Sequence, residues 1–186
     1  KGCKIKFLDG LSENFDHVIF AIPAPLVRVL LSNQSETENS ILSKFATTKN
    51  RAVLHSDIRF MPKMRKVWSS WNFLHNYNGN SESEPPAVTY WMNRLQRIDD
   101  RQNFFVSLNP REKIEPSKVF YETEYSHPQF DLDTLDAQAQ IDNIQGLGGI
   151  WYAGAWLGYG FHEDGFISAI KIAKKFDCVP SWLNDI

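Results

Sequence analysis

Residues 150–173, IWYAGAWLGYGFHEDGFISAIKIA, carry the pattern that decides the fold. Residues 150–153 are apolar and of strand length, and residues 154–164 combine glycines with aromatic side chains. An amphipathic stretch over residues 165–176 follows and has its lysines near its end, as a helix favours. The order predicts a β-strand, a glycine loop and an α-helix. In open α/β sheets, ligands bind at the carboxyl ends of the strands, which is where Gly154 is expected.

The composition of this loop suits a ligand that approaches the backbone closely. Gly158, Gly160 and Gly165 carry no side chain that would keep a ligand away. The free N–H groups at the start of the helix would present partial positive charge, which suits a phosphate or the carbonyl edge of a flavin ring. A structural turn with an ordinary helix cap accounts for the same residues equally well.

The N-terminal part of the chain predicts a second α/β segment. Residues 3–8 alternate in polarity and residues 15–22 (FDHVIFAI) have the composition of a second strand, which predicts a hairpin or two neighbouring strands. From Val18 to Ile22 the second strand is apolar on both faces, which is typical of a central strand in a parallel sheet. Helices are expected at residues 26–31 and, capped by Ser35 or Thr37, as far as about residue 46.

The middle of the chain has a different character. Short alternating segments separated by turn residues predict an antiparallel sheet of about five strands. These segments are residues 52–58, 66–74, 87–95, 103–108 and 118–125. Residues 77–86 are expected to form a long hairpin loop, and a helix is expected to start at Asp131 or Asp133 and to run to about residue 144.

The expected fold is therefore of the α/β (mixed α+β) class, with an antiparallel-sheet domain inserted into a domain formed by the two ends. The predicted boundaries are residues 1–48 and 145–186 for the first domain and residues 49–144 for the inserted one.

The composition excludes several classes of protein. The chain has 186 residues and a net charge of −2, so it lacks the basic character of a nucleic-acid-binding protein. No apolar run approaches the length of a membrane span. Two cysteines predict neither a disulfide framework nor a closed zinc site, and they are typical of reduced thiols in a cytoplasmic protein. Aromatic residues make up 13% of the chain, which indicates a rich core or a pocket for a flat ligand.

Several of these segments resemble the flavin-containing amine oxidase superfamily. Residues 150–173 are similar to its C-terminal FAD-binding motif, and residues 15–31 (FDHVIFAIPAPLVRVLL) to the strand and helix that return to its FAD domain. The chain resembles more closely a branch of amine-oxidase-like proteins that are predicted to bind NAD or FAD. The shared stretches are NRAVLHSD (50–57), MPK (61–63), WSSWNFL (68–74), VTYWMNRLQ (88–96), FVSLNP (105–110) and GYGFHEDG (158–165).

The resemblance implies a flavoprotein oxidoreductase in which the substrate transfers a hydride to FAD. It implies a Rossmann-like FAD-binding domain formed by the two ends and a substrate domain in the middle. The cofactor-binding residues that it implies are Gly154, Ala155, Trp156, Gly158, Tyr159, Gly160, Phe161, Glu163, Asp164, Gly165 and Phe166. The substrate would be a small molecule, either an amine or a lipid acyl chain.

The sequence departs from the pattern of this superfamily in two ways. Ala155 stands where many members place a glutamate directly after Ala-Gly. The GxGxxG loop that holds the ADP half of FAD is absent, and the chain begins at Lys1 without a methionine. We therefore expect the chain to be the C-terminal half of such an enzyme. The missing half would come from the same or a partner chain, and these residues alone would hold FAD weakly.

The candidate catalytic residues are His162, His55 and Trp71. His162 lies in the glycine loop and is either a residue near the flavin or a packing residue. His55 lies in a predicted strand and is either a pocket residue or an ordinary polar one. Trp71 alternates with Trp68 along a strand, so one of the two is expected to face a core.

Other features point to no further chemistry. The histidines have no spacing typical of a metal site, and no Ser-His-Asp motif supports a hydrolase. Lys63, Arg65 and Lys66 form a basic cluster that fits a hairpin turn better than an anion site. The alternative function is a non-catalytic module whose sheet binds an apolar ligand or a partner without flavin.

Overall fold

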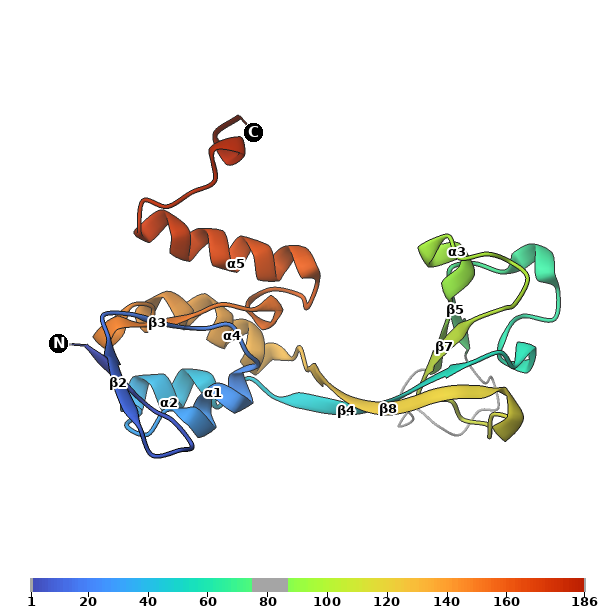
Figure 1. Cartoon of the computed structure of the whole chain (residues 1–186), viewed down its shortest axis with the longest axis horizontal. Helices are drawn as coiled ribbons and strands as arrows, with labels where there is room; N and C mark the ends of the chain where they lie inside the picture. The colour runs from blue at the N-terminus through green and yellow to red at the C-terminus, as the bar shows by residue number, and fades with distance from the viewer. Residues whose placement is uncertain (1, 75–86, 186) are drawn as a thin grey trace. The chain divides into compact units, whose positions relative to one another are not determined.

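The computed structural model describes residues 2–74 and 87–185, so the predicted loop at residues 77–86 lies outside the described residues. Helices occur together with parallel and antiparallel strands, which confirms the predicted mixed α/β class. The chain divides into two compact units (Figure 1). Unit 1 combines Lys1–Thr48 with Pro128–Ile186, and unit 2 is Lys49–His127.

Unit 1 contains a two-stranded antiparallel sheet, β1–β2, and a two-stranded parallel sheet, β3–β9. In Figure 1, helix α5 and helices α1 and α2 lie on opposite sides of the β3–β9 pair. The elements are β1 (Cys3–Lys6), β2 (Ser12–Phe15), β3 (Val18–Phe20), α1 (Ala24–Leu30), α2 (Glu36–Leu42), α4 (Leu132–Gln140), β9 (Ile150–Tyr152) and α5 (His162–Lys175). Short 3-10 helices lie at Ile141–Asn143, Leu147–Gly149, Ala155–Leu157 and Ser181–Asp185.

The prediction of a single strand at residues 15–22 is wrong. The chain bends at Asp16 and His17, so that β2 pairs with β1 in a hairpin while β3 pairs with β9, far along the chain. Phe15 and Val18–Phe20 therefore pair with different strands. Periodicity could not reveal this, because it does not identify the strand to which a segment bonds.

The two edges of the parallel pair differ. Phe20 accepts a hydrogen bond from the Ala153 N–H at 2.9 Å, so the backbone groups of Ile19 point to the opposite edge of β3. No described strand pairs with that edge, and Ile19 is 51% exposed. The outer edge of β9 is instead closed by Gln145, whose side-chain amide bonds the N–H and C=O of Tyr152 at 2.9 and 2.8 Å. The central position predicted for β3 is thus not reached within the described residues.

The core of unit 1 surrounds a buried tyrosine–glutamate pair. The Tyr152 hydroxyl donates to Glu38 Oε1 at 2.9 Å, and the Ser35 hydroxyl and N–H both donate to Glu38 Oε2 at 2.8 Å. Ser35 therefore caps α2, which selects it over the alternative cap, Thr37. Burial and the bond to Glu38 raise the pKa of Tyr152, so its hydroxyl stays a donor. The surrounding buried residues are Ala24, Val27, Ile41, Leu42, Phe45, Ala137, Ile144 and Trp156.

Helix α4 belongs to unit 1, although the predicted domain boundary placed it with the middle segment. Ala137 on α4 and Ile144 just after it are fully buried among Val27 and Leu42 of α1 and α2. The units separate at Pro128 rather than at residue 144. An amphipathic helix pattern shows which face is buried, but the domain that buries it is set by tertiary packing.

Unit 2 is organised around a five-stranded sheet in the order β5-β6-β7-β4-β8. The predicted sheet is present, and its β4–β7, β5–β6 and β6–β7 pairs are antiparallel. The elements are β4 (Thr47–His55), β5 (Trp71–Leu74), β6 (Ala87–Trp91), α3 (Met92–Gln96), β7 (Phe105–Leu108) and β8 (Val119–Pro128). Short 3-10 helices lie at Ile58–Phe60, Arg65–Val67 and Pro116–Lys118.

Two predicted strands of unit 2 are shorter than expected. Residues 66–74 begin with a 3-10 turn, so that only β5 is extended. Residues 87–95 turn into helix α3 after Trp91, because the Asn93 side chain organises the following loop. It donates to the Asp99 and Gln102 carbonyls at 2.8 and 2.7 Å and accepts from the Phe104 N–H at 2.7 Å. No helix in the described chain is both long and apolar enough to cross a bilayer.

We expect Tyr152→Phe to lower the free energy of unfolding by about 1–3 kcal/mol, because Glu38 Oε1 would then lose its hydrogen-bond donor inside the core. Urea unfolding at neutral pH measures this change. Tyr121→Phe is the matched control: Tyr121 is 60% exposed, and we expect a change within about 0.5 kcal/mol. Equal losses in the two variants would show that the buried hydrogen bond contributes nothing.

Candidate functional site

The predicted strand, loop and helix are all present. β9 ends at Tyr152, the loop spans residues 153–161, and α5 begins at His162, three residues before the predicted start. Side chains from α4 and α5 hold the loop in place. Gln138 of α4 donates from Nε2 to the carbonyls of Trp156 and Gly158, at 2.9 and 2.6 Å.

Ser168 connects the end of β9 to helix α5. Its hydroxyl accepts a hydrogen bond from the Gly154 N–H at 2.9 Å and donates one to the Gly165 carbonyl at 2.6 Å. Ser168 is buried, so this hydroxyl has both of its hydrogen-bonding roles satisfied away from water. Sequence reasoning missed Ser168 and Gln138, since each acts on backbone groups that only the fold brings near.

Asp164 shapes the loop from inside. Its Oδ2 accepts hydrogen bonds from the N–H groups of Tyr159 and Phe161, at 3.0 and 2.8 Å. A Cβ on Gly158 would stand only 2.4 Å from Asp164 Oδ1, so glycine is required there for this carboxylate to turn inward. Asp164 thus bonds the loop itself, which leaves Glu163 as the exposed acidic side chain in the first turn of α5.

Some backbone N–H groups of the loop and of the first turn of α5 take no part in these hydrogen bonds. Within the described chain, the N–H groups of Ala155, Trp156, His162 and Glu163 have no acceptor. Two of them belong to the first turn of α5, where the helix dipole adds partial positive charge. A Cβ on Gly165 would lie 3.4 Å from the Ala155 nitrogen, in van der Waals contact, so a larger side chain at this position would crowd the backbone of Ala155. This arrangement can bind an anionic or carbonyl oxygen.

The aromatic residues of the loop divide between core and surface. Trp156 is buried. Its Nε1 donates to the Ile22 carbonyl at 3.0 Å, and its ring packs edge to face with that of Phe45, with 4.5 Å between the ring centroids. Tyr159 and Phe161 are exposed, and Phe166 on α5 stacks on Trp182 at 5.8 Å. Gly160 has a φ of +89°, a conformation that favours glycine.

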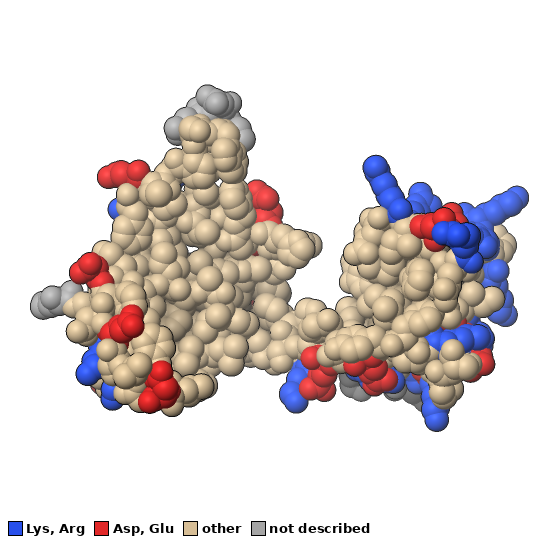
Figure 2. All heavy atoms as spheres, in the orientation of Figure 1, with Lys and Arg blue, Asp and Glu red and all other residues tan. Residues whose placement is uncertain are grey.

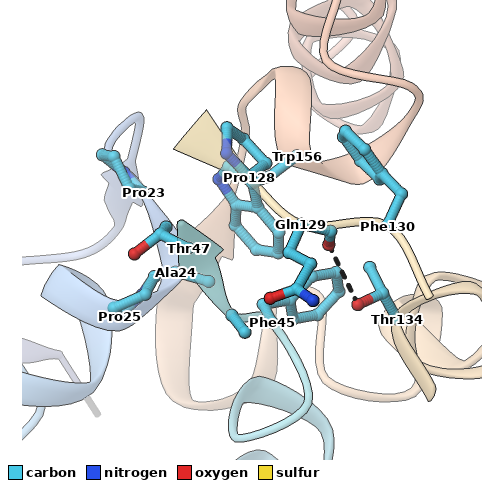
Figure 3. Close-up of a pocket in the computed structure, with 11 residues that line it drawn as sticks. Pro23, Ala24, Pro25, Phe45, Thr47, Pro128, Gln129, Phe130, Thr134 and Trp156 are labelled. Carbon is cyan, nitrogen blue, oxygen red and sulfur yellow. Dashed lines mark hydrogen bonds between the residues drawn. The ribbon is translucent and has the colours of Figure 1, made fainter. Parts of the chain in front are cut away.

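A small cavity borders Trp156 (Figure 3). Its walls come from the turn after β3, residues 45–47, residues 128–130, and Thr134 of α4. The dashed line in Figure 3 marks the hydrogen bond from the Thr134 hydroxyl to the Gln129 carbonyl, at 3.2 Å. With a volume of about 10 Å³, the cavity has room for roughly one water molecule and not for an aromatic ring.

The structure does not gather the three candidate catalytic residues into one unit. His162 is exposed on the first turn of α5 in unit 1, whereas His55 and Trp71 belong to unit 2. Trp71 is 65% exposed on β5 and stacks on Tyr90 at 6.3 Å, while Trp68 is buried. One tryptophan of the pair thus faces a core, as expected, although Trp68 precedes the strand.

His55 is the centre of a buried hydrogen-bond chain. The Asp57 N–H donates to His55 Nδ1 at 3.1 Å, so Nε2 carries the proton and donates to Ser107 Oγ at 2.8 Å. Ser107 in turn bonds Thr89 Oγ1 at 2.7 Å. Burial lowers the pKa of His55 to about 4, despite the opposing effect of the Asp57 charge.

Ser107, His55 and Asp57 are the residue types of a catalytic triad, but their geometry is different. The Asp57 carboxylate pairs with Arg59, whose side chain holds the pKa of that carboxyl well below its usual range. His55 donates to Ser107 instead of taking its proton, and the side chains of Ser107, His55 and Asp57 are all buried, whereas Arg59 is exposed. These residues therefore form a structural network. No group of three or more His, Cys, Asp or Glu residues in the described chain could hold a metal ion.

A scan of protein-family models gives no match to the chain, and a search of curated proteins gives none. Solved structures do match. A protoporphyrinogen oxidase-like protein of Exiguobacterium sp. 255-15 superimposes with a TM-score of 0.61 at 14% identity. A fatty acid isomerase of P. acnes that produces CLA matches with a TM-score of 0.60 at 14% identity, and a reduced UDP-galactopyranose mutase with 0.59 at 9%.

The chain shares the fold of these three solved structures. The three matches cover 93%, 93% and 94% of this chain, so the likeness includes both units. They cover only 43%, 44% and 44% of the other chains. The chain thus spans less than half the length of these solved structures.

We expect the stability of unit 2 to depend on His55 in acid. The pKa of His55 is about 4 when folded and 6.5 when unfolded, so below pH 6.5 the unfolded state binds the extra proton first. The free energy of unfolding falls by about 3 kcal/mol between pH 6.5 and pH 4 from this group alone. The contribution is fully present above pH 6.5.

Urea unfolding across this pH range tests the effect, with His55→Gln as the comparison. The variant is less stable at pH 7, but its free energy of unfolding declines less steeply toward pH 4, since other groups titrate equally in both proteins. Parallel pH profiles would contradict a neutral buried His55.

Asp164→Ala is expected to loosen the glycine loop. Loss of the two bonds to Tyr159 and Phe161 should lower the free energy of unfolding by about 1 kcal/mol and speed amide exchange at both residues. Glu163→Ala removes the same charge from the same turn without removing a loop contact and should change stability by less than about 0.5 kcal/mol. Hydrogen exchange would count against the role of Asp164 if both variants behaved alike.

Proposed function

We propose that this chain forms part of an FAD-dependent oxidoreductase and that residues 154–166 bind the flavin side of the cofactor. The observation that carries the proposal is the set of free N–H groups at Ala155, Trp156, His162 and Glu163, in a loop shaped by its own side chains. The likeness to a protoporphyrinogen oxidase-like protein supports the same reaction class.

The residues present fit the flavin side of FAD. FAD would supply two-electron oxidation by accepting a hydride from the substrate. The first turn of α5 would bind a carbonyl oxygen of the ring and stabilise negative charge that develops there. Gly165 leaves room beside the Ala155 N–H, and Asp164 keeps the loop in place without facing the ligand. His162 presents an exposed imidazole at the start of the same helix.

The ADP half of FAD needs residues that this sequence lacks, since it contains no GxGxxG loop. We propose that a further segment, of the same chain or of a partner, adds its strands to the open edge of β3 at Ile19. The edge of β9 is closed by Gln145, so β3 is the edge left for pairing. A parallel pair of two strands with an exposed apolar edge residue is typical of an incomplete α/β sheet.

Unit 2 would act as the substrate domain for a small molecule. Its edge strand β5 exposes Trp71 and Phe73, two large apolar side chains that suit an apolar substrate. The substrate expected from the sequence is an amine or an acyl chain, and the likeness to a fatty acid isomerase supports the acyl chain.

The test compares two proteins. One is the chain of residues 1–186, and the other is the product expressed when the in-frame coding sequence upstream of Lys1 is included. We expect the longer protein to keep its yellow colour through desalting after incubation with FAD, and the shorter one to lose it. In the longer protein, Gly165→Val should abolish FAD retention, because the added methyl groups approach the Ala155 N–H. Circular dichroism melting should stay close to that of the parent.

Ala169→Val is the control for this experiment, since it adds bulk to an exposed position of the same helix. We expect it to retain FAD. If Gly165→Val also retained FAD, the glycine loop would not be the flavin site. If the longer protein bound no FAD, the binding-module alternative would replace the oxidoreductase.

A further inference from the structure

One end of unit 2 carries a concentration of positive charge. Figure 2 shows Lys and Arg gathered over the part of unit 2 that holds α3. We call this the basic surface and define it by Lys63, Arg65, Lys66, Arg94, Arg97 and Arg101, all of which are exposed. Asp99 and Asp100 lie in the same segment as the last of these, which leaves an excess of positive charge.

The two segments that form the basic surface are held on one aromatic platform. The rings of Trp68 and Trp91 meet edge to face at 5.2 Å, and the Arg65 guanidinium lies over both, at 5.3 and 5.9 Å from their centres. Arg94 Nη1 donates to the Trp68 carbonyl at 3.4 Å. Cation–π stacking of this kind keeps the charge of Arg65 while fixing its position. The platform therefore connects the segment of Arg65 to the segment of Arg94.

The cations of the basic surface differ from others on unit 2. Lys49, Arg51 and Lys118 pair with Glu124, Glu122 and Glu115, at 2.9, 2.6 and 2.6 Å. By contrast, Lys63, Lys66 and Arg97 pair with no carboxylate of the described chain. Arg101 pairs with Asp99 at 3.0 Å. Unpaired, clustered cations are what an anionic partner requires.

Aliphatic side chains lie between these cations. Met64 and Val67 are 64% and 53% exposed, and they alternate with the cations of their segment. Leu95 and Ile98 are 52% and 38% exposed, and they alternate with Arg94 and Arg97 in the other segment. Exposed aliphatic residues interspersed with Lys and Arg are typical of a surface that enters the headgroup region of a bilayer.

We propose that the basic surface docks unit 2 onto an anionic lipid bilayer. Lys63, Lys66 and Arg97 would contact lipid phosphates, while Met64 and Leu95 enter the boundary between headgroups and acyl chains. A nucleic acid fits less well, because aliphatic side chains offer no flat face for stacking bases. The proposal does not depend on FAD, so its failure would leave the oxidoreductase proposal intact.

The experiment is co-sedimentation of the full chain with vesicles of phosphatidylcholine, with and without phosphatidylglycerol. We expect binding to the anionic vesicles, little binding to phosphatidylcholine alone, and weaker binding as salt rises. The triple variant Lys63→Gln, Lys66→Gln, Arg97→Gln should bind anionic vesicles on the order of 100-fold less tightly. The triple variant Lys49→Gln, Lys113→Gln, Lys118→Gln removes the same charge elsewhere on unit 2 and should keep most of the binding.

A second pair of substitutions separates a bilayer from other anionic partners. Met64→Ser with Leu95→Ser should weaken binding to anionic vesicles at physiological salt and leave binding to heparin or single-stranded RNA unchanged. Circular dichroism checks that each variant is folded. Equal binding of anionic vesicles by the two triple variants would overturn the proposal, and so would the absence of vesicle binding. The proposal would also be overturned if the chain bound an acidic polymer more tightly than vesicles and the aliphatic substitutions did not change its vesicle binding.

Discussion

The parallel pairing of β3 with β9 is the constraint on which the rest of the structure depends. It joins Val18–Phe20 to Ile150–Tyr152 and so closes the chain over more than a hundred residues. Closing so long a loop has a large entropic cost, which a pair of three-residue strands cannot offset alone. The buried residues of α1, α2 and α4, which pack around Tyr152, supply the rest of the stabilising free energy. Everything between residues 49 and 127 can then form a unit of its own.

The glycine loop that follows β9 is ordered by the same packing. Its carbonyls are taken by Gln138 and part of its N–H groups by Asp164 and Ser168, all on helices that pack beside β9. Because these side chains bond only some of the backbone groups of the loop, the remaining N–H groups are left together without acceptors. Ala155 and Glu163, which carry free N–H groups, can therefore bind a cofactor, whereas the Trp156 ring is buried.

Residue type alone misleads in unit 2. His55, Asp57 and Ser107 are of the residue types found in catalytic triads, yet all three are buried. Asp57 bonds Arg59 through its carboxylate, and His55 donates to Ser107, so the serine is not activated as a nucleophile. A burial-lowered pKa at His55 accompanies this structural role. By contrast, the exposed cations near α3 look like an ordinary turn in the sequence. In the structure, Arg65 lies over Trp68 and Trp91, whereas cations elsewhere on the unit, such as Lys49, pair with carboxylates.

The sequence by itself determined the fold class, the five-stranded middle sheet, and the strand–loop–helix order at residues 150–173, because local hydrophobic periods and glycine positions reflect local geometry. It also narrowed the cap of the second helix to Ser35 or Thr37, of which the structure has Ser35. Three features depend on tertiary contacts: residues 15–22 are divided between two sheets, α4 packs in unit 1, and Asp164 turns into the loop. Each of these depends on a partner distant in sequence or on a side chain's direction, and neither leaves a periodic signal. The site was thus predictable as a segment, while the atoms within it that face a ligand were not.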